Sequence, residues 1–369
     1  MNKKLLHTPE GVRDIYGNEY AKKLWIENKL HHVIGSFGYD DIQTPTFEFF
    51  DVYSKDIGTT PSNELYKFFD KEGNTLVLRP DFTPSIARCA AKYFLEESVP
   101  IRFCYLGNTF INTSNLQGKL KEVTQIGAEL INDDSIQADA EMLSMVIECL
   151  KNTGLQSFQL SIGQVEFFKG LCAEAGLDSD TENELRDYIS GKNYFAAEKL
   201  LESKDIPEPY RTNLLKVTDM FGDIESLNAC LELVNNDLSK SAIHRLEAIY
   251  EVLKLYGVEE YVSFDLGMLS KYHYYTGIIF KAYTYGLGDA IVTGGRYNKL
   301  IQKFGKEAAA IGFAVVVDDM MEALNRQKVE LDITENKQTI YYTDKNYKEQ
   351  LAKAIEVRKS GAKVQLIPE

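Results

Sequence analysis

The sequence has little cysteine and histidine, and neither residue occurs at a spacing that holds a metal or a disulfide framework. Its five cysteines are scattered without a CxxC pair, and its five histidines form no HExxH motif. Dispersed thiols of odd number are typical of a reducing compartment. No apolar run reaches the roughly 18 residues that span a membrane, and the N-terminus lacks a signal-peptide core. We therefore expect a cytoplasmic protein without a metal, a cofactor or a membrane partner.

Positive charge is also scarce. The 369 residues include 41 lysines and arginines against 55 aspartates and glutamates, which gives a net charge of −14. Nucleic acid backbones are bound mainly through lysine and arginine, so the composition argues against a nucleic acid partner, although an acidic protein can still carry one basic face. The apolar share of 44% and the charged share of 26% are ordinary for a globular protein of one large or two smaller domains.

The pattern of apolar residues predicts an α+β fold with an antiparallel sheet flanked by helices. Residues 101–112 and 121–132 alternate apolar and polar side chains, which predicts an antiparallel hairpin. Helices are expected over 17–36 and from Asp139 to Asn152. The apolar face of the first helix is expected to hold Leu24, Leu30, Val33 and Ile34. Further strands are expected over 75–79, 262–266, 276–284 and 289–293.

Two changes of pattern indicate the domain organisation. Residues 165–256 are helical almost throughout and predict a helical insertion in a domain of residues 1–330. Residues 335–369 predict strand, helix and strand, a single βαβ unit. Such a unit is too small to bury a core of its own, so we expect it to pack on another part of the protein or to be a fragment of a larger domain.

Six stretches within residues 1–330 carry a recognisable set of motifs. They begin at "TPEGVRDIYGNEYAKK" and "LRPDFTP", continue through "CYLGNTFINTSNLQGKLKEVTQIGAEL", and end with "YYTGIIF", "GGRYNKL" and "AIGFAVVVDDM". Each stretch alone is a weak signal, but their order is that of the catalytic domain of histidyl-tRNA synthetases, which this part of the chain resembles. The resemblance implies a class II aminoacyl-tRNA synthetase-like fold. The C-terminal βαβ unit is similar to the first third of that family's anticodon domain.

The resemblance also implies a pocket for histidine. The family's Q-x-G-x-E strand, which holds the amino group and the imidazole, stands here as Gln125, Gly127 and Glu129. By this resemblance Tyr275 matches the family's imidazole partner. A carboxylate and a phenol together can satisfy both ring nitrogens. The complete set of expected histidine-binding residues is Asp81, Thr83, Gln125, Glu129, Tyr274, Tyr275 and Arg296.

Five of these residues also have a structural interpretation that involves no ligand. Tyr274 and Tyr275 could be ordinary sheet residues. Gln125 and Glu129, which an even spacing puts on one strand face, could face solvent. Asp81 could serve only as the N-cap of the helix that follows it.

Three arginines that the synthetases use in catalysis are absent. Their positions hold Ile111, Ser270 and Asp319. Adenylation gathers negative charge in its transition state, and losing one fixed charge-stabilising donor costs about 3–4 kcal/mol of barrier. Asp319 would in addition repel phosphate. We therefore expect no adenylation activity and no catalytic residue.

A retained amino-acid pocket beside a disabled ATP site resembles the regulatory subunit of ATP phosphoribosyltransferase, a synthetase paralogue. The resemblance implies a partner, the short catalytic subunit, that this chain would activate, with L-histidine as the feedback effector of histidine biosynthesis. It also implies a homodimer through the first class II motif within a larger hetero-oligomer. Members of that family often keep one or more of the three arginines, whereas this chain has lost all of them.

Two other functions stay open at this point. One is a working histidyl-tRNA synthetase, and the other is a stand-alone pseudo-synthetase that senses tRNA or modulates another complex. The missing arginines, the acidic balance and the short C-terminal unit argue against the first. The lack of a full RNA-binding domain argues against the second.

Overall fold

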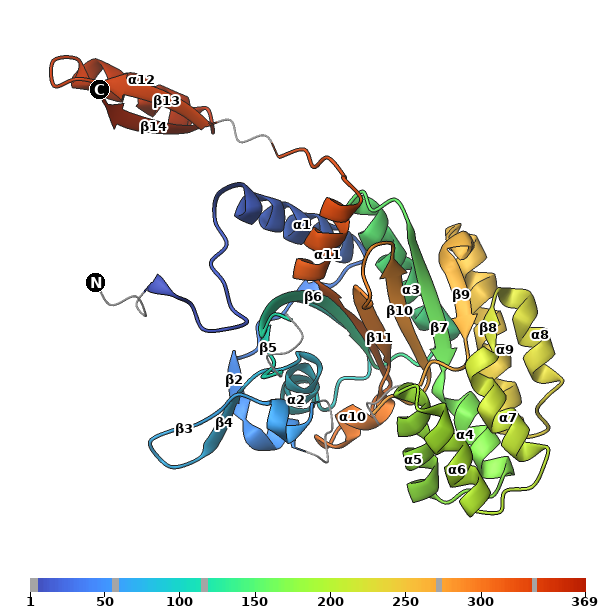
Figure 1. Ribbon diagram of the computed structural model, residues 1–369. Coiled ribbons are helices and arrows are strands. Elements are labelled where there is room, and N and C mark those ends of the chain that lie inside the picture. Colours follow the sequence, from blue (N-terminus) through green and yellow to red (C-terminus); the bar gives the residue numbers. More distant parts are fainter. Residues whose placement is uncertain (1–5, 55–59, 114–118, 270–273, 334–336) are drawn as a thin grey trace. The chain divides into compact units, whose positions relative to one another are not determined.

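The structure is a computed structural model, and it describes residues 6–54, 60–113, 119–269, 274–333 and 337–369 (Figure 1). The chain divides into two compact units, Met1–Val329 and Glu330–Glu369. Within the described residues, no helix is both long and apolar enough to cross a membrane.

The first unit is built around a mixed sheet. Among the described residues, its strands follow the order β1-β5-β6-β12-β11-β10-β7-β9-β8. In that order their bounds are Asp40–Asp41, Ile101–Phe110, Glu122–Ile131, Ala310–Val316, Val292–Arg296, Ile278–Thr284, Phe158–Gln164, Val262–Asp265 and Phe221–Gly222. The expected hairpin is confirmed as β5 and β6, paired from Ile101 opposite Ile131 to Phe110 opposite Glu122.

The sheet is antiparallel, as expected, except at two pairs of strands. β1 pairs with β5, and β7 with β9, in parallel. The chain leaves β7 through a series of helices before it returns as β9, and a crossover of this kind brings a strand back in the same direction. The six strands from β5 to β7 are antiparallel throughout.

Helices α1 (Gly17–Ser36), α3 (Ile136–Asn152) and α11 (Val317–Arg326) pack together beside the sheet (Figure 1). The buried apolar residues of α1 are Ile26, Leu30, Val33 and Ile34. Leu24 is 39% exposed, contrary to expectation. It precedes Ile26 by two residues, which is about 200° around a helix of 3.6 residues per turn, so it faces away from the core.

The other face of the sheet carries α2 (Thr83–Tyr93) and α10 (Asn298–Gln302), which contact each other. Phe82 and Ile86 pack there with Tyr105 from β5 and Tyr297 from the start of α10. A small antiparallel sheet precedes α2, formed by β2 (Phe47–Phe49), β4 (Thr75–Leu78) and β3 (Lys67–Phe69). This face therefore places the start of α2 above β5 and β6.

Residues 165–256 form the helical insertion between β7 and β9. Its helices are α4 (Val165–Glu174), α5 (Ser179–Ser190), α6 (Tyr194–Ser203), α7 (Tyr210–Lys216), α8 (Ile224–Leu231) and α9 (Asp237–Tyr256). Several of them begin at an Asp or Asn whose side chain accepts a hydrogen bond from a backbone amide of the first turn, as the N-cap preference predicts. These caps are Asp178, Asn193, Asp223 and Asn236. Short 3-10 turns lie at Phe50–Tyr53, Ser62–Glu64, Val217–Asp219 and Glu259–Tyr261.

The second unit has the expected order of strand, helix and strand. β13 (Lys337–Tyr342) and β14 (Lys363–Pro368) pair in parallel, and α12 (Tyr347–Lys359) connects them. Ala354 of α12 is fully buried, whereas most other side chains of the unit are partly or fully exposed.

Candidate functional site

A pocket of about 110 Å³ lies on the α2 face of the sheet, over β5, β6, β11 and β12. The start of α2 and the segment at Tyr274 and Tyr275 complete its wall. All expected histidine-binding residues except Arg296 line it: Asp81, Thr83, Gln125, Glu129, Tyr274 and Tyr275. Strands, a helix start and a loop segment that are far apart in the sequence therefore converge on one small polar cavity.

Glu129 is the buried acid of this pocket. Its side chain is held at both oxygens, since Thr83 Oγ1 donates to Oε1 at 2.8 Å and Tyr297 Oη donates to Oε2 at 2.6 Å. Burial raises the pKa of Glu129 to about 8, while the two hydroxyl donors act in the opposite direction. A ligand that brings an N–H donor or a positive charge would favour the ionised form.

Glycines make room for these side chains. A Cβ added at Gly312 would lie 1.6 Å from Glu129 Oε2, and one added at Gly295 would lie 2.7 Å from the ring of Tyr275. Side chains larger than hydrogen at either position would displace the carboxylate or the phenol. The glycines in the β11 and β12 motifs are thus explained by close packing.

Gln125 carries an unpaired polar atom at the boundary between this pocket and its surroundings. Its Oε1 is buried, and no hydrogen-bond partner for it exists among the described residues. Buried polar atoms are normally paired. An amide oxygen only accepts hydrogen bonds, so this atom could be paired by a donor such as an ammonium group.

Asp81 is more than a helix cap. The N-cap position of α2 is Phe82, and Asp81 Oδ1 accepts a hydrogen bond from the Thr83 amide at 3.2 Å. Burial raises the pKa of Asp81, and backbone and side-chain donors partly offset this rise. Its carboxylate lines the pocket near Glu129, so two acids face the same small space.

Arg296 does not line this pocket, contrary to expectation. Its guanidinium is 2% exposed and bonded to Asp139, with Nε and Nη2 at 2.9 and 2.6 Å from Oδ1. Neighbouring residues of a strand face opposite sides. Because Gly295 faces the pocket, Arg296 points away from it and Tyr297 points back.

Two tyrosines of the pocket were missed by the sequence reasoning. Tyr297 bonds to Glu129, and strand alternation starting from Gly295 would have found it. Tyr105 stacks on Phe82 with ring centroids 4.3 Å apart, and its hydroxyl donates to the Phe313 carbonyl at 3.2 Å. No motif position marked Tyr105, because only the paired register of β5 and β6 brings it to the pocket.

A larger hollow of about 790 Å³ adjoins the pocket and shares Ile111 and Gln125 with it. Asp319 lies in this hollow, whereas Ser270 lies outside the described residues. Its acidic lining residues are Glu19, Glu64, Asp289, Asp318, Asp319 and Glu322, and its basic ones are Arg13, Lys119 and Arg326. Burial, followed by the carboxylates of Asp318, Glu322 and Asp289, raises the pKa of Asp319 to about 6. An environment that disfavours one more negative charge is unsuited to a triphosphate.

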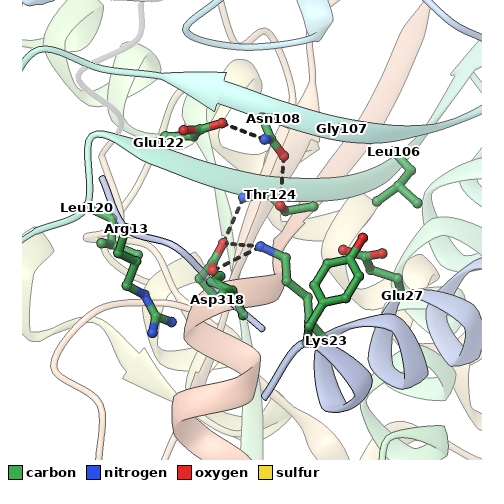
Figure 2. Close-up of a pocket in the computed structure, with 12 residues that line it drawn as sticks. Arg13, Lys23, Glu27, Leu106, Gly107, Asn108, Leu120, Glu122, Thr124 and Asp318 are labelled. Atoms are coloured by element: carbon green, nitrogen blue, oxygen red, sulfur yellow. Dashed lines mark hydrogen bonds and ion pairs between the residues drawn. The ribbon is translucent and has the colours of Figure 1, made fainter. Parts of the chain in front are cut away.

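A third hollow, of about 370 Å³, lies between α1 and the hairpin of β5 and β6 (Figure 2). Lys23 Nζ lies 3.1 Å from Asp318 Oδ1, and the Thr124 amide donates to Asp318 Oδ2 at 2.8 Å. Asn108 bridges Thr124 and Glu122 with hydrogen bonds of 2.8 and 2.7 Å. Because these polar groups are satisfied by each other, the hollow offers a ligand much less than the Glu129 pocket does.

One trio of described side chains has metal-ligand chemistry. The candidate ligand atoms of His31, Asp41 and Cys104 lie within 4.8 Å of one another. His31 Nε2 is 2.6 Å from Asp41 Oδ1, and burial raises the pKa of the Cys104 thiol to about 12. A hydrogen bond between His31 and Asp41 beside a protonated thiol accounts for this trio, which lines none of the three hollows.

Comparison with known proteins first establishes the class. Residues 11–320 match the family described as histidyl-tRNA synthetase. The histidyl-tRNA synthetase of Nostoc sp. has the same fold, with a TM-score of 0.81 over 98% of this chain and 86% of that chain, at 18% identity. The expected class II synthetase-like fold is thereby confirmed.

Closer relatives identify the family. A Bacillus halodurans structure described as an ATP phosphoribosyltransferase regulatory subunit/histidyl-tRNA synthetase is 32% identical, with a TM-score of 0.89 over 99% of this chain and 93% of that chain. The ATP phosphoribosyltransferase regulatory subunit of Acetivibrio thermocellus is 38% identical over 361 residues, which are 98% of this chain and 86% of that protein. The chain belongs to the family of ATP phosphoribosyltransferase regulatory subunits. The resemblance inferred from the motifs is confirmed.

Proposed function

We propose that this chain is a non-catalytic subunit that binds L-histidine in the Glu129 pocket, activates a short ATP phosphoribosyltransferase catalytic subunit and confers feedback inhibition on it. The observation that carries the proposal is Glu129, buried and held by Thr83 and Tyr297, beside the unpaired oxygen of Gln125. The relatives named as regulatory subunits support the assignment of the partner.

The chemistry of the pocket fits histidine. An imidazole N–H would donate to Glu129 and the second ring nitrogen would meet the Tyr275 hydroxyl, while the ammonium would donate to Gln125 Oε1 and Asp81. Amino acids without the ring nitrogens would bury Glu129 without bringing the N–H donor that favours its ionised form, which is the strongest basis for discrimination. The carboxylate of histidine finds no described cation in the pocket, since Arg296 is committed to Asp139.

Adenylation activity is not part of the proposal. Ile111 lines both the pocket and the adjoining hollow, and Asp319 adds negative charge where a synthetase would hold a triphosphate. Each missing fixed donor costs about 3–4 kcal/mol of barrier. The family resemblance implies a homodimer formed through the first class II motif, and we extend the proposal to this assembly. The catalytic subunit would complete a cytoplasmic hetero-oligomer.

Feedback inhibition sets a thermodynamic condition. Histidine must bind the inhibited assembly more tightly than the active one, because a ligand with equal affinity for both shifts neither. The affinity of the complex for histidine should therefore fall when substrates of the catalytic subunit hold it in the active state.

The test is calorimetric titration of the purified chain with L-histidine and then with ATP. Glu129→Gln keeps the size of the side chain but cannot ionise when the ligand binds, so we expect histidine affinity to fall about 10- to 150-fold, as for the loss of a charge-assisted hydrogen bond of roughly 1.5–3 kcal/mol. Glu122→Gln is the matched control on the same strand, because Glu122 lies on the opposite face and bonds to Asn108. Histidine binding unaffected by Glu129→Gln would move the effector site elsewhere.

The same variants then enter an assay with the short catalytic subunit. We expect wild type and Glu122→Gln to give activation that histidine reverses, and Glu129→Gln to give activation that resists histidine. Histidine-dependent pyrophosphate exchange by the chain alone would instead favour a working synthetase.

A further inference from the structure

Arg296, which does not line the pocket, lies in a buried group of charges at the end of β11. We call this group the Asp139 cluster, and it consists of Asp139, Arg296, Arg245 and the adjoining Asp133 and Asp134. Asp139 is fully buried, and its Oδ1 accepts both Nε and Nη2 of Arg296. Arg296 Nη1 also donates to the Asp133 carbonyl at 2.8 Å and lies 3.1 Å from Asp134 Oδ1. A carboxylate and a guanidinium so deeply buried are tolerated only because they are paired.

The second carboxylate oxygen of Asp139 is bound by a residue of the helical insertion. Arg245 of α9 donates through Nε to Oδ2 at 2.8 Å, and its Nη2 lies 2.6 Å from the same oxygen. Its Nη2 also donates to the Asp134 carbonyl at 2.9 Å. One carboxylate therefore joins an arginine of the sheet to an arginine of the insertion, on the packed contact between α3 and α9.

The backbone on either side of Arg296 forms the wall of the pocket. The Arg296 carbonyl accepts the Thr276 amide at 2.8 Å, which fixes the segment that follows Tyr275. Tyr297, the next residue, donates to Glu129, and the Asn298 amide donates to Thr276 Oγ1 at 3.0 Å. A shift of the Arg296 side chain would thus reach the segment after Tyr275 and would also reach Tyr297, which holds Glu129.

We propose that the Asp139 cluster couples the helical insertion to the pocket, with Arg296 and Arg245 as positioning residues for histidine binding. The inference rests on the proposed function only for the identity of the ligand. Coupling is reciprocal. If the contact between Arg245 and Asp139 raises the affinity for histidine by some factor, bound histidine must favour that contact by the same factor. The insertion is then the part of the chain whose position reports whether the pocket is filled.

Arg245→Ala tests the coupling without leaving a buried charge unpaired, since Arg245 is 24% exposed and water can replace it on Asp139. Lys254→Ala is the control on the same helix, because Lys254 pairs with Glu251 at the surface. We expect Arg245→Ala to weaken histidine binding about 5- to 20-fold, Arg245→Lys to recover part of the loss, and Lys254→Ala to bind as wild type. In the double variant Arg245→Ala with Tyr297→Phe, the fold-loss of histidine affinity should differ from the product of the two single fold-losses by more than about threefold, as for coupled residues.

Hydrogen exchange gives a readout that needs no ligand. In the free chain, Arg245→Ala should speed exchange of the Thr276 amide and of β11 relative to Lys254→Ala. Unchanged exchange together with wild-type histidine affinity would overturn the coupling, even if Tyr297→Phe binds histidine poorly and the proposed function stands. Faster exchange in a chain that binds no histidine would support the coupling and refute the ligand.

Discussion

Gly312 offers a way to disturb the pocket without removing any of its functional groups. A methyl group at this position would lie 1.6 Å from Glu129 Oε2 and 2.7 Å from the Ala128 carbonyl oxygen. The carbonyl belongs to the β6 strand that pairs with β12 at this point, so it is fixed by the ladder. In Gly312→Ala the carboxylate of Glu129 must therefore move by more than an ångström, and its 2.6 Å contact with Tyr297 is lost.

The magnitude follows from these two effects. Overpacking a tight site costs about 1–3 kcal/mol, and leaving the buried Tyr297 hydroxyl without its partner costs about 1–3 kcal/mol. We expect Gly312→Ala to lower the free energy of unfolding by about 3–5 kcal/mol, and to weaken histidine binding about 100-fold or more because the carboxylate no longer faces the ring.

Urea unfolding measures the first quantity and calorimetric titration the second. Gly35→Ala is the control, since nothing lies within 4 Å of a Cβ there and the residue is in α1. It should bind histidine as wild type and gain up to about 1 kcal/mol from helix propensity. A Gly312→Ala protein that is folded and binds histidine within a factor of about three of wild type would refute the placement of the ligand against Glu129.

Three further predictions concern charges. The free energy of unfolding should fall as pH rises from 4.5 to about 8, because the folded chain holds a proton on Glu129 that the unfolded chain releases, and thermal unfolding of Glu129→Gln should lack this slope. Asp319→Asn should stabilise the chain by about 1 kcal/mol above pH 6 and by less at pH 5 in urea unfolding, since like charges and burial disfavour that carboxylate and solvent screens part of the effect. Lys23→Met should cost about 3–5 kcal/mol by the same measurement, because Asp318 is left buried without a cation, whereas Lys22→Met, on the exposed side, should be close to neutral.

Local patterns in the sequence predicted the elements whose stability is mainly local. Strict alternation gave the β5–β6 hairpin, and helical spacing gave α1. The helix expected from Asp139 begins earlier, at Ile136, because Ser135 accepts the Ala138 amide as its N-cap, a signal that was present and overlooked. The parallel pairing of β7 with β9 was out of reach, since it depends on where a chain of six helices returns.

The site divides in the same way. Residues inside a contiguous motif, such as Gln125 and Glu129, were found because two-residue periodicity fixes their common face. Arg296 was predicted to bind the ligand because its guanidinium could meet a carboxylate. Its actual partner, Asp139, lies 157 residues earlier in the chain. No local pattern reveals that the helix of Asp139 contacts β11. The residue types indicate which side chains are able to bind a ligand, but the strand face on which each one lies determines whether it reaches the pocket.

The pocket and the acidic hollow share Ile111 and Gln125, so one ligand could in principle extend from one into the other. A nucleotide would have to place phosphate near Asp319, where neighbouring carboxylates already raise the pKa of that acid. A free amino acid needs only the smaller cavity, whose unpaired acceptor and buried carboxylate both call for N–H donors. The distribution of charge thus separates the two halves of what would be a single active site in a synthetase. The electrostatics that favour an amino acid in the proposed site therefore disfavour a triphosphate beside it.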